Sequence, residues 1–352
     1  MKSPGLQSAA GYPSAGGGPR PLRVVAMGGG TGLSTLPKGL KRHVSGDEPG
    51  PGGRSVGELC AVVTVTDDGG SSGRLRKEFN VLPPGDIRNC IAALSEDEAL
   101  LSRLFQHRFH TGAGLNGHSF GNLFLTALTA ITGDFAEAVK QSSEILATRG
   151  HIYPSTTSDV QLEAVMADGT RVAGETNITA STERIVEIHL RPADVQPLPQ
   201  TLEAIVQADL ITIGPGSLFT SLVPNLLVRG IPEAVAASRA VKVFVCNLMT
   251  EANESLGLSA ADHIRVLHEH ARLRVVDYAM VNRTPVPSDL KAKYAAEGGS
   301  QIEVDVAAIE KLGAKVILGD YLETAEGVAR HATDRLAHDL LRLASQAAAA
   351  GR

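Results

Sequence analysis

Cysteine is scarce in this chain, which has three cysteines among its 352 residues. Cys60, Cys90 and Cys246 have neither the spacing of a disulfide framework nor that of a zinc site, and the histidines form no zinc pattern either. Cys60 and Cys246 lie in apolar, strand-like runs, so we expect buried thiols in a reducing compartment.

Long hydrophobic runs and an excess of positive charge are also missing. No apolar run reaches the roughly 18 residues of a membrane span, so none is expected. The formal net charge is −5, which disfavours nucleic acid as a partner. Residues 1–21 are rich in glycine, proline, serine and alanine but lack the apolar core of a signal peptide. We therefore expect a disordered tail and a cytoplasmic protein.

Apolar runs typical of buried parallel strands alternate with helical patterns along the chain. With 43% hydrophobic and 20% charged residues, this length can bury a sizeable core. The strand-like runs are 22–27, 59–66, 208–214, 241–247, 275–282 and 314–319, and the helical patterns lie near 87–107, 120–147, 199–207, 231–239, 259–271 and 323–349. This alternation predicts a doubly wound, Rossmann-like α/β fold with a mostly parallel sheet.

The alternation breaks at residues 151–195. Residues 160–166 and 171–173 flank a turn at Asp168-Gly-Thr, as in a β-hairpin, and 185–190 predicts one more strand. We therefore expect one α/β domain over residues 22–340, with a small β-rich subdomain inserted at about 151–195. A helix end or tail follows at 341–352.

A glycine-rich turn follows the first strand and consists of Gly28, Gly29, Gly30, Thr31 and Gly32. Such a turn between strand and helix lets backbone N–H groups close around an anion, and the helix N-terminus adds partial positive charge. It is no dinucleotide fingerprint, because Leu33 stands where the third glycine belongs, and no P-loop, because it has no lysine. We favour a phosphate or nucleotide cradle over a turn that merely packs strand against helix.

A second polar turn follows the second strand and consists of Asp67, Asp68, Gly69, Gly70, Ser71, Ser72, Gly73 and Arg74. Consecutive small residues can form a backbone nest for an anion, and the arginine adds charge-assisted hydrogen bonds. The acids suit Mg²⁺ or a sugar hydroxyl, with Asp68 as the metal candidate. A solvated turn with local salt bridges is the alternative. Gly69–Gly73 and Gly117–Gly121 match the nucleophile motif of hydrolases, but neither has its strand–turn–helix context, so a hydrolase is disfavoured.

Further polar groups are expected at the same sheet edge. Asp86 opens a helix, where it is either a site residue or only an N-cap. The other candidates are Arg88, Asn89, His118, Ser119 and Asn122, and a third strand–turn–helix junction at Gly214, Pro215, Gly216 and Ser217. Because ligands of open α/β sheets bind outside the carboxyl ends of the strands, we expect these turns to converge on one phosphate or nucleotide site.

With these motifs in view, the chain resembles the gluconeogenesis factor (YvcK) family of the CofD-like superfamily. The matching segments lie in fixed order at 28–32, 65–76, 82–89, 118–122, 213–218 and 247–250, and the resemblance covers roughly 22–340. It adds Asn247, Thr250 and Arg330 to the expected site. The family tends to read Arg-His-Asp-Thr near the C-terminus, whereas this chain has Ala332 in place of the acid.

The resemblance implies a cytoplasmic protein that binds a UDP-sugar such as UDP-N-acetylglucosamine. It also implies support of cell shape and cell-wall precursor supply on gluconeogenic carbon sources. The CofD branch instead transfers a 2-phospholactate group with a nucleotide-linked donor and Mg²⁺. We favour a regulatory binder that requires no cofactor. The transferase, a role for Mg²⁺, an unknown protein partner and a homo-oligomer stay open.

Overall fold

The computed structural model describes residues 19–44, 50–96, 100–325 and 327–351. Seven parallel strands form the central sheet in the order β10-β9-β8-β7-β1-β2-β3. Their bounds are β1 Leu22–Gly28, β2 Val56–Val63, β3 His151–Pro154, β7 Leu210–Ile213, β8 Val241–Val245, β9 Tyr278–Asn282 and β10 Lys315–Gly319. The predicted doubly wound α/β fold is confirmed.

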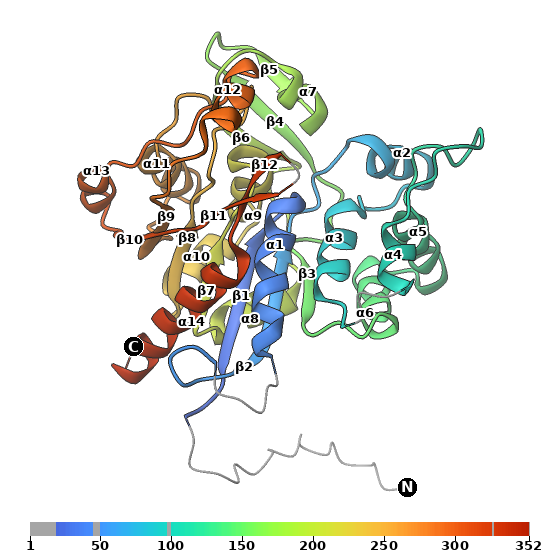
Figure 1. Ribbon diagram of the computed structural model, residues 1–352. Helices are drawn as coiled ribbons and strands as arrows, with labels where there is room; N and C mark the ends of the chain where they lie inside the picture. The colour runs from blue at the N-terminus through green and yellow to red at the C-terminus, as the bar shows by residue number, and fades with distance from the viewer. Residues whose placement is uncertain (1–18, 45–49, 97–99, 326, 352) are drawn as a thin grey trace, which may run out of the picture.

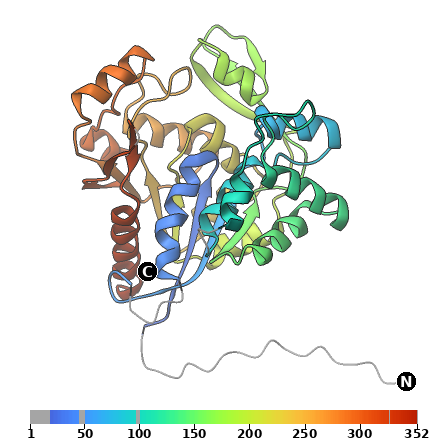
Figure 2. The same ribbon diagram turned by 45° about the vertical axis from the view of Figure 1, so that its right-hand side comes forward.

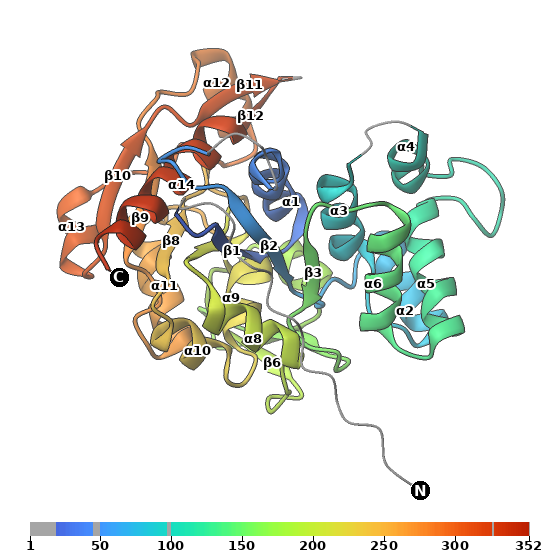
Figure 3. The ribbon, with the colours of Figure 1, turned by 90° about the horizontal axis from the view of Figure 1, so that it is seen from below.

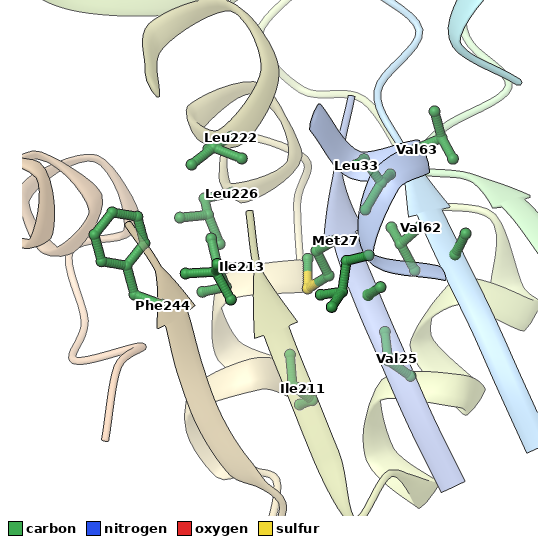
Figure 4. Packing of buried hydrophobic residues seen from close by; sticks show 14 of the residues in the cluster. Val25, Met27, Leu33, Val62, Val63, Ile211, Ile213, Leu222, Leu226 and Phe244 are labelled. Atoms are coloured by element: carbon green, nitrogen blue, oxygen red, sulfur yellow. The ribbon is translucent and has the colours of Figure 1, made fainter. Parts of the chain in front are cut away.

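The central strands are apolar on both faces because helices cover the sheet on both sides. Every residue of β7 and β8 is buried. Figure 4 shows the resulting core, in which side chains of β1, β2, β7 and β8 pack with Leu33 of α1 (Gly30–Leu40) and with Leu222 and Leu226. The strand sequences are therefore apolar throughout, rather than alternating between apolar and polar residues.

The helices form two layers, which Figure 3 shows from below. On one face lie α1, α3 (Gly85–Leu94) and α14 (Thr333–Ala349). On the other lie α8 (Pro199–Gln207), α9 (Val223–Leu226), α10 (Ile231–Ala237) and α11 (Ala260–Ala271). Beside β3, α2 (Gly70–Phe79), α4 (Leu100–Gln106), α5 (Phe120–Thr132) and α6 (Phe135–Ile145) form a helical lobe. No helix within the described ranges is long and apolar enough to cross a membrane.

The strand order reverses between β1 and β7. From β1 the chain builds β2 and β3 outward on one side, then returns to β7 and builds β8, β9 and β10 on the other. After β1 it enters α1 on one face of the sheet, and after β7 it enters the π-helical turn η2 (Leu218–Leu222) and α9 on the opposite face. The two connections diverge and leave a crevice at the carboxyl ends of these strands, the usual ligand position of such sheets.

The β-rich insertion is a three-stranded antiparallel sheet in the order β5-β4-β6, with one helix. Its elements are β4 (Gln161–Met166), β5 (Arg171–Ala173), α7 (Glu175–Ala180) and β6 (Ile185–Arg191). Figures 1 and 2 show it above the carboxyl-end edge of the central sheet. The predicted start of the insertion at 151 is wrong, because His151–Pro154 pairs in parallel with β2 and belongs to the central sheet.

Several predicted helices are divided. The pattern at 120–147 is α5 and α6, separated at Gly133, which has a φ of +72°. The pattern at 87–107 is α3 and α4. The start of the pattern at 323–349 is wrong, because β11 (Leu322–Ala325) and β12 (Val328–His331) form an antiparallel hairpin before α14.

Other elements were not predicted, and part of the predicted tail is not described. These elements are α2, α7, α12 (Ser288–Ala296), α13 (Val306–Lys311) and the 3₁₀ turn η1 (Lys41–His43). Of the predicted N-terminal tail, residues 1–18 lie outside the described residues.

Candidate functional site

A cavity of about 510 Å³ opens at the point where the strand order reverses. Its wall combines the turns after β1 and β7, the segment after β8, the start of α7, and residues of α12 and β12. The predicted residues that line it are Gly29, Gly30, Thr31, Gly32, Asp86, Pro215, Gly216, Ser217, Asn247 and Thr250. Two of the three predicted glycine turns therefore meet in one cavity.

The turn after β1 is shaped by close approach. Gly30 has a φ of +62°, and a Cβ atom on Gly29 would lie 2.6 Å from Cγ2 of Thr64. A Cβ atom on Gly32 would lie 2.6 Å from the carbonyl oxygen of Pro215. The N-cap of α1 provides no side-chain hydrogen bond, and Asp86 takes the N–H of Gly30, so the N–H groups of Thr31 and Gly32 in the cavity wall remain as anion donors.

The turn after β7 is held by one side chain. Oδ1 of Asn247 accepts a hydrogen bond from the backbone N–H of Gly216 (3.0 Å), and Nδ2 of Asn247 donates to the carbonyl oxygen of the same residue (2.8 Å). The Ser217 hydroxyl forms a hydrogen bond with Glu251, and burial raises the pKa of Glu251. Asn247 thus fixes the backbone of the second turn opposite the first.

Comparison with known proteins now identifies the family. The family model described as 2-phospho-L-lactate transferase CofD matches residues 24–322. The chain belongs to the CofD-like family.

Relatives of similar length support this assignment. The chain is 44% identical to the gluconeogenesis factor of Bacillus subtilis strain 168, an alignment of 91% of this chain and 98% of that protein. It is 45% identical to the gluconeogenesis factor of Halalkalibacterium halodurans, over 90% of this chain and 95% of that protein. A crystal structure of a Bacillus halodurans protein superposes with a TM-score of 0.86 at 44% identity, covering 92% of this chain and 100% of that chain.

An acidic group lies beside the glycine turns of this CofD-like chain. The Asp86 carboxylate accepts a hydrogen bond from the backbone N–H of Gly30, yet burial and the nearby Asp67 raise its pKa to about 7. Burial and the charges of Asp67 and Asp86 raise the pKa of Glu175, at the start of α7, to about 9. A bound proton or a bound cation therefore stabilises this group of carboxylates.

Mg²⁺ fits this acidic group in part. Within the described ranges, no three His, Cys, Asp or Glu side chains come together as a metal site. Mg²⁺ is, however, commonly held by one or two carboxylates together with phosphate oxygens. Asp67 and Asp86 are the side chains that would hold it, with a bound phosphate supplying further oxygens and the ion balancing their charge.

Replacing Glu175 by glutamine is expected to stabilise the protein above neutral pH. Because the pKa of Glu175 rises on folding from its ordinary value of 4.5 to about 9, the folded state binds its proton more tightly than the unfolded chain. Its contribution to stability therefore falls as pH rises across this window. Melting temperatures should show Glu175→Gln above wild type at pH 8 and close to it at pH 5. The exposed Glu144→Gln is the control, and equal curves for both variants would contradict the pKa assignment.

Asp68, the predicted metal candidate, is engaged by the insertion. Its Oδ1 accepts hydrogen bonds from the backbone N–H (2.9 Å) and the hydroxyl (2.7 Å) of Thr176 in α7. It does not line the cavity. In this position Asp68 ties the insertion to the turn after β2, and so places the neighbouring Glu175 at the cavity.

The remaining predicted site residues do not themselves line the cavity. Gly28 ends β1. Asp67, Gly69, Gly70, Ser71, Ser72, Gly73 and Arg74 form the turn after β2 and the start of α2, Arg88 and Asn89 lie on α3, and His118, Ser119 and Asn122 lie at the start of α5. Gly214 directly follows β7 and has a φ of +86°, and Arg330 is exposed on β12. The turn after β2 is thus outside the cavity wall, although its Asp67 interacts with Asp86 in that wall.

Several lining residues were missed, among them Glu175, Glu251, Tyr294, Glu297 and His331. Nε2 of His331 donates to the carbonyl oxygen of Cys246 (3.1 Å), and burial lowers the pKa of this histidine to about 4. Its Nδ1 is therefore left as an acceptor. His331 directly follows the motif residue Arg330, which was a usable signal. No sequence signal pointed to Glu175, because only the fold of the insertion brings this residue to the cavity.

Proposed function

We propose that this protein binds a UDP-sugar, with UDP-N-acetylglucosamine as the first candidate, as a regulatory protein of the cytoplasm. The observation that carries the proposal is the pair of glycine turns, Gly29–Gly32 and Pro215–Ser217, which pack against each other and line one cavity. Backbone N–H groups on two sides suit a diphosphate. A cavity of about 510 Å³ is in the range of small-molecule sites.

Polar groups further along the wall suit a sugar. Asn247, Thr250 and Glu251 follow β8, and Glu175 faces them from the insertion. A carboxylic acid that stays protonated near neutral pH can donate a hydrogen bond as well as accept one. The uridine base is supported by the family resemblance rather than by a particular contact.

The names of the relatives support a role in growth on gluconeogenic carbon sources. Both the Bacillus subtilis and the Halalkalibacterium halodurans relatives are called gluconeogenesis factors. We accordingly propose a role in cell shape and cell-wall precursor supply during growth on gluconeogenic carbon sources, exerted through a protein partner that senses the ligand-bound state.

A Mg²⁺-dependent transferase of the 2-phospho-L-lactate type is the second candidate. The observation that favours it is the pair Asp67 and Asp86 beside the first glycine turn. A metal held there would neutralise the phosphate charge of a donor. Turnover of a nucleotide-linked donor by the purified protein, dependent on Mg²⁺, would support it.

Calorimetric titration separates these functions from a dehydrogenase. We expect the purified chain to bind UDP-N-acetylglucosamine with or without Mg²⁺, and to bind GDP and NAD more weakly. UDP-glucose tests the choice of sugar. Tight binding of NAD without binding of any UDP-sugar would contradict the proposal.

A further inference from the structure

Three arginines from separate segments converge on the turn that precedes α5. Nη2 of Arg74, on α2, donates to the carbonyl oxygen of Asn116 (2.7 Å). Nη1 of Arg108, after α4, donates to the carbonyl oxygen of Gly117 (2.6 Å). Arg88, on α3, passes beneath the first turn of α5, where a Cβ atom on Gly121 would lie 2.8 Å from its Cδ.

The positive charge of these arginines is not balanced by close acids. Arg74, Arg88 and Arg108 form no ion pair within 4.0 Å with any described residue, and Nε of Arg88 is buried without a hydrogen-bond partner. Burial and the charge of Arg108 lower the pKa of Arg88, whereas the charges of Asp86 and Asp67 raise it by less. Clustered like charges of this kind are stabilised by a bound anion.

A buried polar network next to the arginines also contains a hydrogen-bond acceptor without a partner. Asn122 is 2% exposed, its Nδ2 donates to the Ser71 hydroxyl (3.1 Å), and its Oδ1 has no partner. The Ser71 hydroxyl also shares a hydrogen bond with Nδ1 of His118 (2.9 Å). Burial and Arg74 lower the pKa of His118, which favours a neutral imidazole with one donor and one acceptor nitrogen.

We propose that Arg74, Arg88, Arg108 and His118 form a phosphoryl-binding subsite, separate from the cavity at the strand reversal. None of the four lines that cavity. Guanidinium groups bind phosphate through paired N–H donors, and a phosphoryl dianion balances more of this charge than a carboxylate does. Arg88 interacts with both Arg108 and Asp86, so it connects the subsite to the acidic group beside the cavity.

Calorimetric titration of the full chain with inorganic phosphate, at constant ionic strength, tests the subsite. Arg108→Gln is the informative variant because Arg108 is exposed and its loss should leave the fold intact; the exposed Arg103→Gln on α4 is the control. We expect Arg108→Gln to bind phosphate at least tenfold more weakly, or to lose one phosphate per chain, with Arg103→Gln unchanged. Arg108→Lys, which keeps the charge without the planar fork, should fall between. Wild-type affinity and stoichiometry in Arg108→Gln would overturn the proposal.

The same variants show where the phosphoryl group comes from. If Arg108→Gln also weakens binding of UDP-N-acetylglucosamine, the subsite holds a phosphate of that ligand. If that binding is unchanged, the subsite takes a second phosphorylated molecule. Should wild type not bind the UDP-sugar at all, the proposed function fails, while the phosphate titration still decides on the subsite.

Discussion

Gly32→Ala is expected to abolish ligand binding at the cavity and to lower the free energy of unfolding by roughly 1–3 kcal/mol, the usual cost of overpacking. The new Cβ atom would lie 2.6 Å from the carbonyl oxygen of Pro215 and 2.8 Å from Cα of Gly216. Both neighbours are backbone atoms, so no side chain can rotate out of the way. The N-terminus of α1 must then move away from the turn after β7, which separates the two sets of N–H donors.

Gly114→Ala is the matched control for this change. A Cβ atom there meets nothing within 4 Å, so the same substitution adds a methyl group without a clash. Chemical denaturation and calorimetry on both variants give the comparison. Ligand affinity at the wild-type level in Gly32→Ala would show that the close approach of the two turns is not needed for binding.

Asn247→Asp is expected to destabilise the protein by about 1 kcal/mol, the usual net contribution of a hydrogen bond, because the group left unpaired is only half-buried, and to weaken ligand binding strongly. Aspartate keeps the acceptor for the N–H of Gly216 but loses the donor to its carbonyl oxygen. It also replaces the amide that donates to Oε1 of Glu251 (3.3 Å) with a second negative charge. The turn after β7 then loses the contact that fixes it opposite α1.

The exposed Asn80→Asp serves as the control because it adds the same charge at a position where both residues tolerate the left-handed backbone. Melting temperature and UDP-sugar affinity should be near wild type in Asn80→Asp and reduced in Asn247→Asp. Equal behaviour of the two variants would show that Asn247 is not needed to hold the turn after β7 or to bind the ligand.

The sequence predicted the central sheet well where its strands are buried on both faces. Runs such as 210–213 and 241–245 are uniformly apolar because helices cover them on both sides. The edge strand β3 was missed because it is short and contains a histidine and a proline, which are not typical of a buried parallel strand. The hairpin β11–β12 was assigned to a helix because its composition differs little from that of the helix that follows it.

The parts of the candidate site that are formed by backbone turns were predictable from the sequence. Glycine turns at strand ends are visible in the sequence, and two of them line the cavity. Side chains that reach a site only through tertiary packing were not predictable in the same way. Glu175 reaches the cavity because Asp68 anchors the insertion through Thr176, and Arg74 lies instead with Arg108 because α2 packs on α5.

The most direct test of the central claim is a crystal structure of the chain with bound UDP-N-acetylglucosamine. We predict that its diphosphate accepts hydrogen bonds from the N–H groups of Thr31, Gly32 and Ser217, in the cavity at the strand reversal, while those of Gly30 and Gly216 stay bonded to Asp86 and Asn247. A ligand bound elsewhere on the protein, with this cavity empty, would contradict the account.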